Sequence, residues 1–127
     1  MDYQKTIAVD FDGTLCDHEY PSIGQPKPGG AEALRLFKSL GYRILIYTCR
    51  TCRWHEDIFG DDPDQPVMQR SRVLDMVDWL KDNNMVYDEI DDGTRGKPLA
   101  DFYIDDKAIH FSDNWKDIME GISSVTN

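Results

Sequence analysis

The sequence predicts a single α/β domain in which an open, parallel β-sheet is flanked by helices. Two observations favour this fold. Apolar, β-prone runs alternate along the chain with segments whose apolar residues recur at helical spacing. Acidic and other polar residues follow directly after three of the strand-like runs, which is where ligands gather in open α/β sheets. The expected order of elements is strand, helix, strand, helix, strand, strand, helix.

The first half of the chain supplies the two clearest strands. Lys5–Phe11 is a short β-branched run that ends at an Asp-Gly turn, as is typical of a buried strand. The segment Cys16–Gly30 is rich in Pro and Gly and is expected to be a loop. Ala31–Leu40 is predicted to be a helix, because its apolar residues share one face and Gly41 is a common helix stop. Tyr42–Thr48 is almost wholly apolar, as expected of a central parallel strand.

The second half begins with a long polar connection, Cys49–Gln65, of the kind that often covers an active site. Helical spacing resumes at Val67 or Gln69 and continues to Asn83. A weak strand is expected over Val86–Ile90 and a clearer one over Asp101–Asp105. The tail, from Asp113 as N-cap to about Glu120, is predicted to form a short last helix.

Length and composition indicate one domain spanning residues 1–127. The 127 residues, 40% of them hydrophobic, suffice for one ordinary core and leave little room for a second. Trp79 and Trp115 are expected to be packing residues. The loops 16–29 and 49–65 are too short for a large inserted cap domain and could provide only partial covers over a site.

The charge of the chain limits its partners. Fourteen basic and 24 acidic residues give a net charge of 14 − 24 = −10, which opposes non-specific binding to nucleic acid or to an anionic membrane. No apolar run approaches the roughly 18 residues of a membrane span, so a cytoplasmic location is expected. Three cysteines cannot all pair within the chain, and reduced thiols are expected.

Carboxylates gather where three predicted strands end. Asp10 and Asp12 follow the first strand two residues apart, so both side chains are expected on one side of an extended backbone. Asp105 and Asp106 follow the last strand. Two like charges 4 Å apart repel by about 4 kcal/mol at an effective dielectric near 20, so a cation is needed among them. Mg²⁺ fits this role because it takes oxygen ligands and is commonly held by carboxylates and substrate phosphate.

Other residues at this edge are candidates for binding substrate. Gly13 permits a sharp turn and a close approach of the backbone to a ligand. The hydroxyl of Thr14 can orient a neighbouring carboxylate. Lys97, before the last strand, could place a positive charge beside the phosphate, and Lys107 is its rival. Arg50 could reach a substrate phosphate or could be an ordinary surface arginine.

Taken in order, these residues resemble the four motifs of haloacid dehalogenase superfamily phosphatases. The motifs are Asp10–Leu15 (Asp-Phe-Asp-Gly-Thr-Leu), Thr48 at the end of an apolar strand, Lys97, and Asp105-Asp106 after a later strand. The resemblance covers roughly Thr6 to Ala108 and implies a Rossmann-like sheet without a large cap domain. The chain is similar to small, capless members of that superfamily, some of which borrow a cover for the active site from a second subunit.

The resemblance implies a role for each motif residue. Asp10 resembles the nucleophile that forms a phospho-aspartate, and Asp12 the general acid and base. Thr48 and Lys97 resemble the groups that bind phosphate. Asp105 resembles a magnesium ligand, alongside Asp10 and the backbone carbonyl of Asp12, with Asp106 in support. An acid at the position of Asp12 favours phosphoryl transfer, because the dehalogenases lack one there.

Several alternatives remain open at this stage. The chain could be a catalytically weak, metal-dependent binding domain for a phosphorylated partner, or a phosphotransferase or mutase of the same fold. The substrate could be a small phosphorylated metabolite or the phosphorylated end of a larger molecule, and a homo-oligomer is possible. A second metal site is a weaker alternative to reduced thiols on loops, and its ligands would come from Cys16, His18, Cys49, Cys52 and His55.

Overall fold

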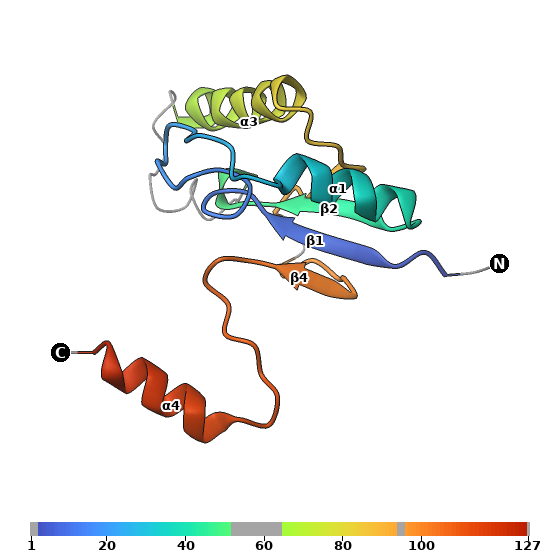
Figure 1. The fold of residues 1–127 in the computed structure, drawn as a ribbon. Helices are drawn as coiled ribbons and strands as arrows, with labels where there is room; N and C mark the ends of the chain where they lie inside the picture. The colour runs from blue at the N-terminus through green and yellow to red at the C-terminus, as the bar shows by residue number, and fades with distance from the viewer. Residues whose placement is uncertain (1–2, 52–64, 94–95, 127) are drawn as a thin grey trace.

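The computed structural model describes residues 3–51, 65–93 and 96–126, and it has the predicted α/β architecture with a four-stranded, all-parallel sheet. The strands are β1 (Thr6–Asp10), β2 (Arg43–Tyr47), β3 (Glu89–Ile90) and β4 (Phe102–Ile104). They lie in the order β3-β2-β1-β4, so the first strand pairs with the last (Figure 1). The chain order of strands and long helices matches the prediction.

The helices of the described chain are α1 (Gly30–Ser39), α3 (Gln65–Asp82) and α4 (Trp115–Ser124), and a short 3-10 turn, Cys49–Thr51, follows β2. The predicted N-cap of the last helix was wrong. Asp113 has a φ of 59°, whereas an N-cap residue has an extended backbone, and Asn114 occupies the cap position without a side-chain cap bond.

Strands β3 and β4 are shorter than predicted, because an aspartate precedes each. Asp88 accepts the backbone N–H of Ile44 at 2.7 Å through its carboxylate, and Asp101 accepts that of Thr6 at 2.8 Å. A side-chain oxygen thus takes the place of the backbone acceptor that an additional strand residue would provide. Regular pairing begins only at the next residue.

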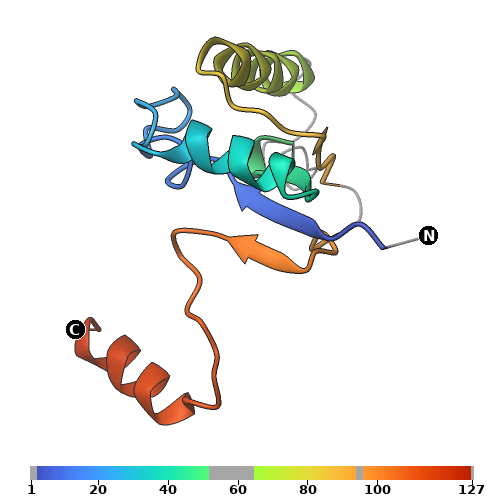
Figure 2. The same ribbon diagram turned by 45° about the vertical axis from the view of Figure 1, so that its right-hand side comes forward.

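The hydrophobic core lies between the sheet and the helices α1 and α3, which cover the same face (Figures 1 and 2). Alternate residues of β1 and β2, among them Ile7, Val9 and Ile44, are buried there. Phe11 follows β1 into this core and meets Trp79 of α3 edge to face, with the ring centroids 5.3 Å apart. Trp79 is therefore a packing residue, as predicted.

The connection from β3 to β4 packs against the opposite face. Tyr103 lies in register with Ala8 of β1, and its hydroxyl donates to the carbonyl of Pro98 at 2.6 Å. Leu45 of β2 lines a cavity with Pro98 and Leu99 from the same connection. This connection, without a helix in its described part, replaces a helical layer on that side.

Helix α4 stands apart from the rest of the domain on an extended connection (Figures 1 and 2). Trp115, at its start, is 65% exposed and meets only the ring of Phe111 among the described aromatic contacts, at 5.1 Å. Trp115 therefore packs against a neighbouring ring, as predicted of a packing residue, but it lies outside the described hydrophobic core. None of the described helices is long and apolar enough to cross a bilayer.

Candidate metal and phosphate site

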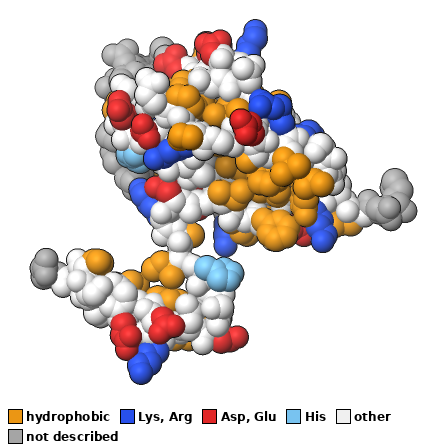
Figure 3. Space-filling model, in the orientation of Figure 1, with side chains coloured by type: hydrophobic (Ala, Val, Ile, Leu, Met, Phe, Trp, Pro, Cys, Tyr) orange, Lys and Arg blue, Asp and Glu red, His pale blue; other side chains and the backbone are white. Residues whose placement is uncertain are grey.

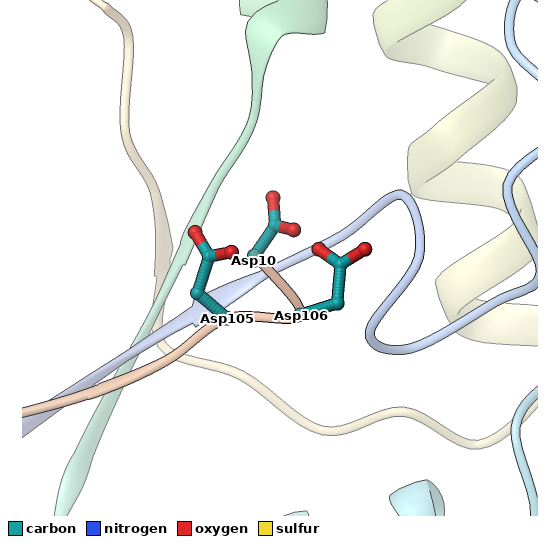
Figure 4. A group of neighbouring side chains, drawn as sticks. All are labelled: Asp10, Asp105 and Asp106. Atoms are coloured by element: carbon teal, nitrogen blue, oxygen red, sulfur yellow. The ribbon is translucent and has the colours of Figure 1, made fainter. Parts of the chain in front are cut away.

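Three aspartates meet at the carboxyl ends of β1 and β4. Asp10 is the last residue of β1, and Asp105 and Asp106 follow β4 directly. Because β1 and β4 are parallel neighbours, residues 95 positions apart in sequence (105 − 10) become adjacent. One carboxylate oxygen from each aspartate lies within 4.8 Å of the others, and the three side chains point toward one another (Figure 4).

The surroundings of Asp10 disfavour its ionised form. Burial raises its pKa to about 7, and the charge of Asp105 and the contact with Asp106 act in the same direction. The hydroxyl of Thr14 lies 3.3 Å from the Asp10 carboxylate and donates to it, as the sequence predicts. A carboxylate in this state gains from any cation placed beside it.

Asp105 is held in its ionised form. The backbone N–H of Lys107 donates to one carboxylate oxygen at 2.7 Å, and the Tyr47 hydroxyl donates to the other at 2.7 Å. These two bonds hold the pKa of Asp105 below its ordinary value. Burial and the bond to Asp105 raise the pKa of Tyr47, which keeps its hydroxyl protonated as a donor.

The donor set fits Mg²⁺. It consists of carboxylate oxygens alone, which are the ligands that Mg²⁺ prefers, and one oxygen from each aspartate lies within 4.8 Å of the others. Burial is the main cause of the raised pKa of Asp10, and the neighbouring carboxylates Asp105 and Asp106 add to it. The site is half-open, since Asp106 is exposed, and this leaves room for water and substrate oxygens.

Gly13 allows Asp106 to lie against the turn that follows β1. Its φ is +89°, a left-handed value that L side chains rarely adopt. A Cβ atom at this position would lie 2.4 Å from Oδ2 of Asp106. The glycine therefore admits a metal-ligand candidate as well as shaping the turn.

Asp12 does not join the group of three. Both of its carboxylate oxygens accept hydrogen bonds from Arg50, at 2.9 Å from Nε and 2.8 Å from the terminal nitrogen Nη2. Arg50 itself is only 1% exposed. The Asp12 side chain, predicted to be the general acid and base, lines the same cavity as Asp10, and its predicted metal contact through the backbone carbonyl stays a prediction.

Arg50 is committed to the protein rather than presented to a substrate. Besides Asp12, it donates to the carbonyls of Pro21 and Ser22 at 3.0 and 2.9 Å. Its guanidinium lies 5.5 Å from the ring centroid of Phe11 and 5.0 Å from that of Tyr20. The predicted substrate-binding role of Arg50 is not supported, because four of its five N–H donors are already used within the protein.

A cavity of about 520 Å³ opens at the aspartates. It is lined by Asp10, Asp12, His18, Tyr20, Tyr47, Thr48, Cys49, Asp91, Gly93, Gly96, Pro98, Asp105 and Lys107. Thr48 thus lines the same cavity as Asp10, and its hydroxyl accepts the backbone N–H of Arg50 at 3.1 Å. His18 and Tyr20 bring the loop 16–29 to the cavity wall.

The two lysine candidates lie differently. Lys107 lines the cavity of Asp10, whereas Lys97 lines two adjoining cavities. One of these shares Asp91 and Pro98 with the cavity of Asp10, and the other shares Pro98 and Asp105 with it. The ammonium of Lys97 lies over the ring of Tyr103, 4.4 Å from its centroid. An exposed contact of this kind contributes about 0.5–1 kcal/mol, so the side chain can leave it at little cost.

The second metal site is not formed by the described residues. Cys16 is fully buried in the core, and its thiol lies 3.7 Å from the carbonyl of Phe11. His18 and Cys49 line the cavity, but in the described part of the chain only the three aspartates form a group of potential ligands. Cys52 and His55 lie outside the described residues, as does most of the loop 49–65.

Sequence reasoning missed two contributors. Tyr47 lies in register with Asp10 on the neighbouring strand. Because side chains alternate between the two faces along each strand, the sequence could have placed Tyr47 on the same side of the sheet as Asp10. The pairing of Arg50 with Asp12 had no such signal, because it depends on a three-residue turn after β2.

Comparison with known proteins gives structural relatives without a stated function. No protein-family model matches the chain, and no curated protein matches it. A conserved protein from Bacteroides thetaiotaomicron is 26% identical, with a TM-score of 0.62 over 98% of this chain and 94% of its own. A crystallised target protein from Vibrio cholerae is 27% identical, with a TM-score of 0.52 over 97% of this chain and 100% of its own. Both likenesses extend over nearly the whole chain, which supports the α/β fold.

Proposed function

We propose that this chain is a Mg²⁺-dependent phosphomonoesterase, a small haloacid dehalogenase-like member without a large cap domain, whose nucleophile is Asp10. The observation that carries the proposal is the cluster of Asp10, Asp105 and Asp106 at one sheet edge, beside Thr14 and Thr48. The cluster offers only oxygen ligands, and its surroundings disfavour the ionised form of Asp10, the proposed nucleophile. Both features suit a phosphoryl transfer that is assisted by Mg²⁺.

Asp10 and Asp105 would hold the cation, with Asp106 as the third carboxylate. When bound, Mg²⁺ would offset the negative charge of the carboxylates and of the phosphate that approaches them. Tyr47 and the backbone of Lys107 fix Asp105, and Thr14 orients Asp10. These contacts hold the oxygens in place before substrate arrives, which lowers the cost of organising them during the reaction.

The reaction proceeds in two displacements at phosphorus. A carboxylate oxygen of Asp10 forms a bond to phosphorus while the ester P–O bond breaks, and the departing alkoxide takes a proton from Asp12. Water then attacks the phosphoryl group, gives its proton to Asp12, and releases inorganic phosphate and the free Asp10 carboxylate. Thr48 and a lysine, Lys97 or Lys107, would hold the peripheral oxygens.

Asp12 must give up a bond to Arg50 to carry a proton. In the conformation described here both of its oxygens are occupied by the guanidinium. Arg50 would stay in place during such a movement, because the carbonyls of Pro21 and Ser22 also hold it. The pair therefore defines a resting position for Asp12 from which the acid can turn toward the cavity.

The same pair supports one alternative function. If Asp12 remains bound to Arg50, the chain would bind a phosphorylated partner with Mg²⁺ and turn it over weakly. Tight binding of one phosphorylated compound, together with a flat activity screen over many phosphates, would favour this alternative.

The decisive experiment compares the parent protein with Asp10→Asn on a generic aryl phosphate, with and without Mg²⁺. Asp82→Asn, at the exposed end of α3, is the matched control. We expect turnover only with Mg²⁺, loss of turnover in Asp10→Asn, and no effect in Asp82→Asn. Acid-quenched protein should also gain the mass of one phosphoryl group, and Asp10→Asn should not. Turnover of Asp10→Asn at the parent's rate would refute the assignment.

A binding test separates the metal site from catalysis. Because Mg²⁺ binds the folded state preferentially, millimolar Mg²⁺ should raise the melting temperature of the parent protein. Asp105→Asn should reduce this shift, since it removes one negative ligand. An unchanged melting temperature in an intact parent protein would contradict the proposed ligands.

A further inference from the structure

Helix α4 exposes an apolar stripe. Trp115, Met119 and Ile122 recur at intervals of four and three residues and therefore lie on one side of the helix. They are 65%, 60% and 50% exposed. Asp117 and Glu120 lie on the opposite side. A helix with this pattern normally buries its apolar side against another surface.

The domain exposes a second apolar surface along β4. The register places Phe102 and Ile104 beside Ile7 and Val9 of β1, whose side chains belong to the core under the helices. Phe102 and Ile104 therefore face the helical side of the sheet, yet they are 51% and 37% exposed. No described helix covers β4 on that side.

The neighbouring flank of α1 extends this surface. Lys38 binds Asp88, just before β3, and so marks the flank of α1 that faces away from β4. Leu36 and Leu40, four residues apart, share a face of α1 that points away from Lys38 and from the buried Leu34, and both are exposed. We call Leu36, Leu40, Phe102 and Ile104 the α1/β4 strip. Hydrophobic side chains gather where α1, β1 and β4 lie (Figure 3).

We propose that α4 of one copy of this chain lies on the α1/β4 strip of a second copy, and that the exchange is reciprocal. Every chain carries one apolar stripe on α4 and one α1/β4 strip. In a two-fold dimer the stripe of each chain covers the strip of the other, so the same contact is made twice. The extended connection, residues 107–114, spans at most about 26–29 Å and can reach a neighbouring molecule.

The connection has its own order. Phe111 packs against Trp115, and the side chain of Asn114 accepts the backbone N–H of Ser112 at 2.8 Å. These contacts tie residues 111–114 to the start of α4, which lies apart from the rest of its own chain (Figure 2).

The area involved suits a stable dimer. The stripe, the strip and the exposed apolar residues of the connection, Ile109 and Phe111, provide nine large side chains that are about half exposed. At about 100 Å² each, half of what an aromatic side chain buries, they offer on the order of 900 Å² per chain, against about 800 Å² per partner in a standard interface.

The test is the mass of the full chain in solution by light scattering after size exclusion, at about 100 µM, well above the micromolar dissociation constants of weak complexes. We expect twice 14.7 kDa, 29.4 kDa, for the parent protein. Ile122→Glu in the stripe and Leu36→Glu in the strip should each give the monomer mass. Ser124→Glu, on the far side of α4, is the matched control and should remain dimeric.

Phosphatase activity and circular dichroism report on the fold of each variant, because Ile122 and Leu36 lie away from the aspartates. A monomeric parent protein would overturn the proposal and would indicate that α4 returns to its own domain. A dimer that persists in either glutamate variant would overturn it as well, since the contact would then use another surface.

Discussion

Removal of the Arg50 guanidinium tests the most buried ion pair among the described residues. The side chain of Arg50 is wholly buried and that of Asp12 is 13% exposed. Arg50→Gln would leave the Asp12 carboxylate without its two charge-assisted hydrogen bonds and would remove the donors to the carbonyls of Pro21 and Ser22.

The expected cost follows from those contacts. Removing one partner of a buried pair typically costs about 3–5 kcal/mol, because the remaining charge stays desolvated. Domains of this kind are stable by about 5–15 kcal/mol, so the variant should remain folded but be markedly weakened. Arg43→Gln is the matched control, because its pair with Glu89 is roughly one-third exposed on both sides and should cost about 0–1 kcal/mol.

Urea unfolding of four proteins measures the pair itself: parent, Arg50→Gln, Asp12→Asn and the double variant. We expect the double variant to lose less than the sum of the single variants, by about 1–3 kcal/mol, since each single change leaves a partner unpaired. If Arg50→Gln cost no more than Arg43→Gln, or if the two changes at the pair were additive, the structural role assigned to Arg50 would be refuted.

Three further predictions concern the site. Gly13→Ala should lower the free energy of unfolding more than Gly41→Ala, because both glycines have positive φ but only at Gly13 would a Cβ atom meet Asp106. Gly13→Ala should also weaken Mg²⁺ binding in a melting assay. Equal losses of stability in the two variants would contradict this reasoning. Without divalent cations, the melting temperature should rise as pH falls from about 8 to 6, because the pKa of Asp10 is raised to about 7 in the folded chain and is ordinary in the unfolded chain, so that the folded chain binds the proton more tightly. Asp10→Asn should show a smaller rise, and an equal rise would assign the effect to other groups. If Lys97 turns from Tyr103 to the phosphate, Lys97→Met should lower kcat by about 10²-fold and Lys107→Met by less than tenfold. The reverse ranking in steady-state kinetics would identify Lys107 as the phosphate ligand.

The strands that position the site could be predicted from sequence, because their signal is strong and local. β1 and β2 were predicted to within one residue at each end, since a continuous apolar run bounded by turn residues describes a buried parallel strand well. Their ends fix Asp10 and Thr48. The meeting of Asp10 with Asp105 followed from the rule that parallel strands carry their ligands at one edge.

The features that sequence did not predict lie where the structure depends on contacts between segments. Asp12 lies two residues after Asp10, and the strand pattern predicts that both can act on one substrate atom. The chain leaves the strand at Asp10, however, and the turn lets Asp12 bind Arg50 instead. For Trp115, an aromatic residue in an amphipathic helix indicates burial but does not identify the surface that buries it.

The division of the aspartates into three and one has a consequence for charge. Four carboxylates with Arg50 carry −4 + 1 = −3, and a divalent cation reduces this to −1 before substrate arrives. A phosphate dianion would still meet net negative charge, in a chain whose total is −10. If a phosphate dianion binds there as proposed, Lys107, which lines the cavity, or Lys97 would supply the further positive charge. Burial, with the charges of Asp105 and Asp106 in addition, raises the pKa of Asp10 to about 7, and binding of a cation beside it should release the proton that it retains near neutral pH.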